Sequence, residues 1–90
     1  WFEFADPTSG RTVRLDVVQP ASLHVSATHV SVHDLYEART ATELRPRPEL
    51  FVHVDVAHRG VGTASCGPDV LPQYKLTPGT YEFAYRLTVR

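Results

Sequence analysis

The chain has no methionine, only one cysteine and no long apolar run among its 90 residues. One cysteine cannot form a disulfide within the chain, so the fold must be stable without such a cross-link, which fits a reducing compartment. No stretch approaches the roughly 18 apolar residues that a membrane helix needs, and nothing resembles a signal peptide. We therefore expect a cytoplasmic protein without a membrane partner.

An excess of either charge is also absent. Nine lysines and arginines oppose ten aspartates and glutamates, which gives a formal net charge of −1, and there is no basic run. Because nucleic acids bind clustered positive charge, we expect no nucleic-acid partner. The missing methionine and the abrupt strand-like start Trp1-Phe2-Glu3-Phe4 predict a segment of a longer protein.

What the sequence does contain is alternation of apolar and polar residues, the pattern of half-buried strands. It predicts strands over residues 1–4, 12–18, 23–28, 50–56, 70–76 and 81–89. The first two are expected to form a hairpin across a turn at residues 6–10. The last two are expected to form a hairpin across a type II turn, with Pro78 and Gly79 at its centre. Most aromatic residues fall in phase with the apolar faces and are expected in the core.

One short helix is expected among the strands. Ser31 and Asp34 have the spacing of a capping box, which predicts a helix from residue 32 to about residue 40. Residues 45–48, Arg-Pro-Arg-Pro, are interpreted as an extended, solvated linker rather than an anion site. Six or seven strands with one short helix favour an all-β fold, an antiparallel β-sandwich, with residues 1–90 as a single segment.

Residues 59–69, Arg-Gly-Val-Gly-Thr-Ala-Ser-Cys-Gly-Pro-Asp, hold three of the five glycines and the only cysteine. Such small residues pack poorly, so the stretch is predicted as a shaped loop between strands, where binding chemistry concentrates. It lacks the third glycine and following helix of a dinucleotide site and the Gly-Lys-Ser/Thr of a phosphate loop.

No complete catalytic set is present. The expected helix start separates His29 from His33, so these residues and His24 are expected to face solvent rather than to bind zinc. Cys66 has no general base nearby in sequence, which disfavours a thiol nucleophile, although a distant histidine is not excluded by sequence. No pair of carboxylates stands out for glycoside hydrolysis. We expect no catalytic and no metal-ligating residue in this chain.

Residues 59–69, Leu71-Pro72-Gln73-Tyr74 and Pro78-Gly79-Thr80-Tyr81-Glu82-Phe83 resemble the C-terminal end of large bacterial β-galactosidases of glycoside hydrolase family 2. Upstream, Ser26-Ala27-Thr28-His29, Asp34-Leu35 and residues 43–49 match the same region in order. The resemblance covers about residues 23–87. It implies the C-terminal part of a large, non-catalytic β-sandwich domain of a multidomain enzyme that hydrolyses terminal β-D-galactosides.

The resemblance also implies a role for the loop. In that family a loop of this domain reaches the mouth of the active site, and many members carry a tryptophan there as a platform for the sugar. Aligning residues 67–70 with the segment after this tryptophan puts Cys66 in its place. Ser65, Cys66 and Gly67 are then expected to contact the galactoside substrate.

The same resemblance implies what the chain lacks. The family's catalytic glutamates lie on a central β/α barrel, and its magnesium and sodium ligands also lie outside this segment. The expected partners are therefore the other domains of the same enzyme, above all the catalytic barrel.

A second hypothesis stays open, a self-contained carbohydrate-binding or protein-interaction β-module. Aromatic residues make up 10% of the chain, which allows it. Sugar-binding modules expose an aromatic platform, however, whereas most aromatics here are expected in the core. An isolated segment with uncovered sheet edges is also expected to self-associate.

Overall fold

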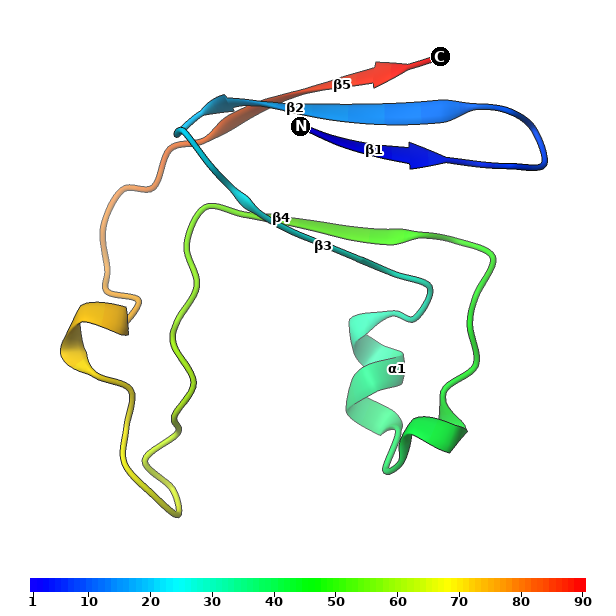
Figure 1. Cartoon of the computed structure of the whole chain (residues 1–90). Helices are drawn as coiled ribbons and strands as arrows, with labels where there is room; N and C mark the ends of the chain where they lie inside the picture. Colours follow the sequence, from blue (N-terminus) through cyan, green and yellow to red (C-terminus); the bar gives the residue numbers. More distant parts are fainter. The chain divides into compact units, whose positions relative to one another are not determined.

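The computed structural model describes residues 1–90, which form two antiparallel sheets and one short α-helix (Figure 1). The strands are β1 (Phe2–Ala5), β2 (Thr12–Gln19), β3 (His24–Thr28), β4 (Phe51–Asp55) and β5 (Ala84–Val89). The helix α1 spans Val32–Glu37, and two short 3-10 helices, η1 and η2, span Ala41–Glu43 and Pro72–Tyr74. The all-β prediction with one short helix is confirmed, with five strands rather than six or seven. The packing of the sheets as a sandwich stays a prediction.

Two compact units divide the chain. The first comprises residues 1–23 and 55–90, and the second comprises residues 24–54. The three-stranded sheet, in the order β1-β2-β5, belongs to the first unit, and the β3-β4 sheet belongs to the second. The helix α1 has six residues, and no helix of the chain has the length and apolarity needed to cross a bilayer.

The predicted first hairpin is confirmed. β1 and β2 pair antiparallel, with Phe2 opposite Leu15. In the connecting turn, Asp6 accepts hydrogen bonds from the Thr8 N–H at 2.9 Å and from the Ser9 hydroxyl at 2.5 Å. Gly10 closes the turn with a φ of +71°, a conformation that glycine adopts without steric cost.

The predicted last hairpin is wrong. β5 pairs with β2 instead, which places Leu87 opposite Leu15. Residues 70–76 do not form a strand: Pro72, which has no N–H to donate to a ladder, begins the 3-10 helix η2. The type II turn is also absent, because Gly79 does not take the positive φ that this turn requires.

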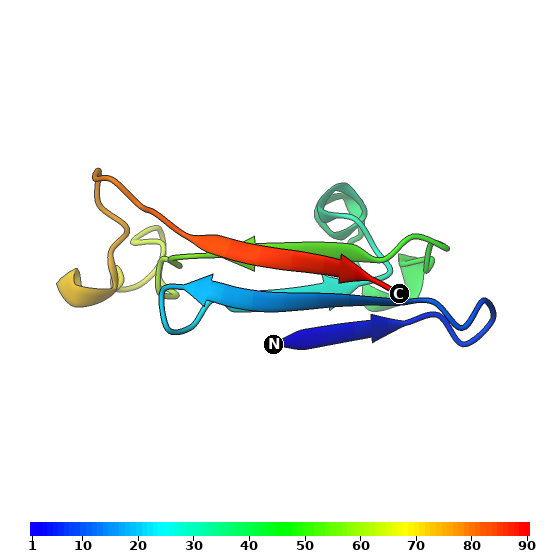
Figure 2. The same ribbon diagram turned by 90° about the horizontal axis from the view of Figure 1, so that it is seen from above.

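The second unit contains a two-stranded sheet and the helix. β3 and β4 are neighbours and run in opposite directions (Figure 2). The capping box is confirmed, since Ser31 Oγ accepts from the Asp34 N–H at 3.1 Å and the Asp34 carboxylate accepts from the Ser31 N–H at 2.8 Å. The helix ends earlier than predicted, at Glu37, and the chain turns into η1, where Glu43 accepts a hydrogen bond from the Arg39 N–H.

Only three apolar side chains are buried, namely Leu15, Leu23 and Val70, and of these Leu15 alone is fully buried. All three belong to the first unit. The expectation that most aromatics lie in the core is wrong. The exposed aromatic residues are Trp1, Phe2, Tyr36, Tyr74, Tyr81, Phe83 and Tyr85. Strand alternation therefore predicted which side chains share a face, but not that the face is covered.

Candidate functional site

The glycine-rich loop has an incoming arm, residues 59–62, and an outgoing arm, residues 69–74. The two arms approach so closely that side chains on the glycines would not fit between them. A Cβ atom on Gly60 would lie 2.4 Å from Val70 Cγ2 and 2.9 Å from Tyr74 Cβ. A Cβ atom on Gly62 would lie 2.7 Å from the Val70 backbone nitrogen, and Gly62 has a φ of +137°. The Gly60 N–H donates to the Tyr74 carbonyl at 2.9 Å. Gly60 and Gly62 are therefore required by the shape of the loop.

A single antiparallel bridge between Thr63 and Asp69 closes the loop above these arms. The five residues between them form its tip. Where the tip begins, the hydroxyls of Thr63 and Ser65 lie 2.7 Å apart, and Ala64 has a φ of 60°. The predicted loop is confirmed as an irregular segment with a narrow base, but β4 precedes it and η2, rather than a second strand, follows it.

Asp69 stands at that base and accepts hydrogen bonds from three donors. Its Oδ1 accepts from Arg59 Nη2 and, at 2.8 Å, from the Val70 N–H. Its Oδ2 lies 2.8 Å from Lys75 Nζ. Arg59 Nη2 also donates to the Gly62 carbonyl at 3.1 Å, so one guanidinium contacts both arms. The hydrogen bonds from Lys75 and from the Val70 N–H hold the pKa of Asp69 below its usual range.

The residues predicted to contact substrate lie together at the tip. Ser65, Cys66 and Gly67 are all exposed, and a Cβ atom on Gly67 would meet nothing within 4 Å. The thiol of Cys66 is free and has no hydrogen-bond partner. No histidine or carboxylate activates it, so the tip offers a contact surface rather than a nucleophile.

The histidines considered as zinc ligands are exposed, as expected. His24, His29 and His33 do not form a cluster, and no group of three or more His, Cys, Asp or Glu side chains converges anywhere in residues 1–90. His29 has a structural contact instead. Its Nδ1 lies 3.0 Å from the Arg47 carbonyl and 3.1 Å from the Glu49 carbonyl, so this nitrogen carries the proton and donates.

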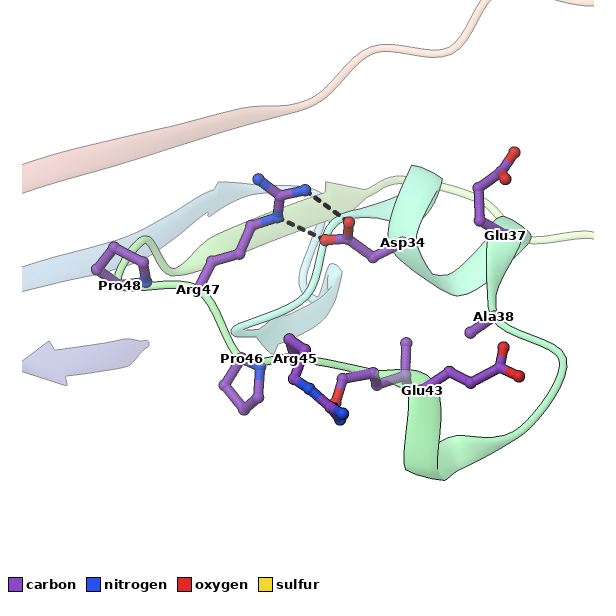
Figure 3. Close-up of a pocket in the computed structure, with 9 residues that line it drawn as sticks. Asp34, Glu37, Ala38, Glu43, Arg45, Pro46, Arg47 and Pro48 are labelled. Atoms are coloured by element: carbon purple, nitrogen blue, oxygen red, sulfur yellow. Dashed lines mark hydrogen bonds and ion pairs between the residues drawn. The ribbon is translucent and has the colours of Figure 1, made fainter.

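The second unit has a pocket of about 540 Å³ between the end of α1, η1 and the connector (Figure 3). On its wall, Arg47 donates from Nε and Nη2 to the two carboxylate oxygens of Asp34, at 2.7 and 2.6 Å. Arg45 donates to the carbonyls of Thr42 and Leu44 at 2.7 and 3.2 Å. Both guanidinium groups are thus hydrogen-bonded within the unit. The connector, residues 45–48, is exposed as predicted for a solvated linker, but these hydrogen bonds anchor it.

The Asp34 carboxylate joins the helix cap to this connector. The hydrogen bonds from Arg47, followed by the one from the Ser31 N–H, hold the pKa of Asp34 far below its usual range. Arg47 is also held through its backbone, because its N–H donates to the His29 carbonyl at 2.6 Å. The ion pair on the pocket wall therefore has a structural role. The loop of the first unit remains the candidate site.

A family model described as the beta galactosidase small chain matches residues 1–87. The chain belongs to this family. A β-galactosidase from Staphylococcus xylosus is 32% identical to the small-chain segment over 62 residues, which are 69% of the segment and 6% of the relative. The segment thus spans a small part of that relative's length. No solved structure matches it significantly.

The resemblance of the small-chain segment to β-galactosidases is therefore confirmed. The sequence predicted the glycine-rich loop and the residues now found at its tip. It did not predict that Arg59 and Lys75 are partners of Asp69. The available signal was the position of these two cations, one at the start of the glycine-rich stretch and one shortly after its end, where its only carboxylate lies. Opposite charges that flank a loop of small residues are candidates for holding its base together.

Proposed function

We propose that this small-chain segment is a non-catalytic part of a β-galactosidase of glycoside hydrolase family 2. It completes a β-sandwich domain and lends the loop tip to the galactoside pocket, where Ser65, Cys66 and Gly67 contact the sugar. Its partners are the other domains of the same enzyme, above all the catalytic barrel. The observation that carries the proposal is the exposed tip, with a free Cys66, on a base held by Asp69.

The chemistry of the reaction lies outside the segment in this proposal. Hydrolysis of a terminal β-D-galactoside needs two carboxyl groups across the scissile bond, and these come from the barrel. Magnesium and sodium, which the family resemblance implies, are held by residues outside the segment in this proposal. The segment itself binds and orients, and it moves no proton.

Cys66 gives the tip a particular character. A tryptophan presents a broad face for a sugar ring and buries about 150–250 Å² of surface, whereas a cysteine offers a small, soft contact. The contact of this tip with a galactoside is therefore weaker than that of an aromatic platform. A weak first contact leaves room for improvement by substitution.

The test is Cys66→Trp in the full-length enzyme that carries this segment, with steady-state kinetics on several β-galactosides. Aromatic contacts contribute about 0.5–1.5 kcal/mol, so we expect KM to change by about 2- to 10-fold with a smaller change in kcat. Val61→Trp is the matched control, because Val61 is fully exposed on an arm of the same loop. Unchanged constants for Cys66→Trp on every substrate would refute contact between this position and the sugar.

A second candidate, a carbohydrate-binding module, is favoured by one observation. Phe83 and Tyr85 are exposed, and their rings stack with centroids 6.2 Å apart and planes 17° apart. Affinity electrophoresis of the full-length protein in gels that contain polysaccharide separates the candidates. Retention that Tyr85→Ala removes, with KM for small galactosides unchanged, indicates a module; no retention leaves the pocket loop as the function.

A further inference from the structure

The tip of the glycine-rich loop has almost no interactions that fix its own position. Its hydrogen bonds are those between the side chain of Thr63 and Ser65. Cys66 is exposed and makes no hydrogen bond, and a Cβ atom on Gly67 would meet nothing within 4 Å. A tip of small residues that lacks packing must take its position from its base. The base is therefore what decides where Cys66 lies.

The base is joined by one carboxylate. Asp69 contacts the incoming arm through Arg59, its own arm through the Val70 N–H, and the residue after η2 through Lys75. The side chain of Asp69 is one-third exposed, and those of Arg59 and Lys75 are a little more exposed, so the cluster lies at the surface beside the tip. Arg59 also contacts both arms, but only Asp69 accepts hydrogen bonds from Arg59, the Val70 N–H and Lys75 together.

We propose that Asp69 is a positioning residue of the galactoside pocket: with Arg59 and Lys75 it holds the loop in the shape that presents Cys66 to the sugar. This inference rests on the proposed function. A tip that is ordered before binding loses less conformational entropy when the sugar arrives, so the cluster acts on substrate binding. It contributes little to the chemical step, because the loop supplies no reacting group.

Asp69→Asn tests the proposal in the full-length enzyme. The neutral amide has one acceptor oxygen and cannot satisfy Arg59, Lys75 and the Val70 N–H together. We expect faster hydrogen exchange at the amides of the tip and a KM about 3- to 10-fold higher, the cost of ordering one to a few groups. The turnover number kcat should change less than twofold, as expected for a positioning residue.

Three further variants make the result specific. Asp69→Glu keeps the charge and should recover part of the loss, while Lys75→Gln removes one contact and should give a smaller change in the same direction. Asp16→Asn is the matched control, since it breaks a similar surface ion pair, with Arg14 at 2.9 Å, on β2. This control should leave both tip exchange and KM unchanged.

The outcomes distinguish the inference from the proposed function. Unchanged tip exchange or unchanged KM in both Asp69→Asn and Lys75→Gln, while Cys66→Trp alters KM, overturns the positioning role and leaves the pocket loop intact. Faster tip exchange with no effect of either Cys66→Trp or Asp69→Asn on KM overturns the proposed function, and the positioning role with it. An equal fall of kcat in Asp69→Asn and Asp69→Glu also overturns positioning, because it indicates general damage.

Discussion

Asp34 in the second unit and Asp69 in the first have closely similar surroundings. Each carboxylate accepts a hydrogen bond from a nearby backbone N–H, that of Ser31 at 2.8 Å and that of Val70 at 2.8 Å. Each also binds an arginine from elsewhere in the chain, Arg47 for Asp34 and Arg59 for Asp69. One aspartate stands at the start of a helix and the other at the base of an irregular loop.

The difference lies in what remains when the carboxylate is removed. Without the Asp34 carboxylate, the helix retains its own backbone hydrogen bonds, such as those from the Leu35 N–H to the Ser31 carbonyl and from the Ala38 N–H to the Asp34 carbonyl. Without the Asp69 carboxylate, the loop retains the Thr63–Asp69 backbone bridge and one hydrogen bond between its arms, from the Gly60 N–H to the Tyr74 carbonyl. Regular structure distributes its support over many bonds, whereas an irregular loop depends on a few residues, and this makes the loop the more sensitive region.

The largest effect is expected where the arms of the loop meet. Gly62→Ala places a Cβ atom against the Val70 nitrogen at a backbone φ of +137°, where strain costs about 2 kcal/mol. Amide exchange of Gly60, whose N–H bonds the Tyr74 carbonyl, should rise about 30-fold.

Gly67→Ala is the control for this change, since it meets open space and has no positive φ. It should leave exchange of the Gly60 amide as it is. Equal exchange in the two variants would remove the basis for calling the loop the more sensitive region.

A smaller effect is expected at the helix. Ser31→Ala removes the side chain that accepts from the Asp34 N–H, a loss of about 1 kcal/mol, and should speed exchange of the Asp34 amide about fivefold. Ser26→Ala on β3, whose side chain is exposed and makes no hydrogen bond, is the control. A Ser31→Ala effect as large as that of Gly62→Ala would contradict the comparison.

Protonation of the two aspartates is expected to have the smallest effect near neutral pH. It distinguishes Asp34 from Asp69 only in acid. Both pKa values are lowered by folding, so the stabilisation is complete above the ordinary value of about 3.9 and is lost as pH falls through each lowered pKa. The lowering is large for Asp34, so Asp69 should protonate first. Carboxyl carbon NMR shifts during acid titration measure the order, and earlier protonation of Asp34 would reverse the comparison.

The elements that sequence predicts correctly have local signals. The first hairpin depends on a turn whose residues bond to Asp6, and the helix start depends on Ser31 and Asp34, three positions apart. The pairing of β5 with β2 has no local signal, because alternation shows the faces of a strand but not its neighbour. The composition of the chain predicted the loop itself. The cluster of Asp69, Arg59 and Lys75 joins residues that are separated in sequence, so it becomes evident only in three dimensions.

The β2–β5 ladder sets an order of events during protein synthesis. It pairs Leu15 with Leu87, and the backbones of Thr12 and Arg90 exchange two hydrogen bonds at 3.0 and 2.9 Å. A ribosome that adds about 5–20 residues per second therefore leaves the free edge of β2 waiting for seconds, while the strands of the β3-β4 sheet are both complete at Asp55. During that interval the nascent β1-β2 hairpin presents an unpaired edge, at which pairing with other chains can begin.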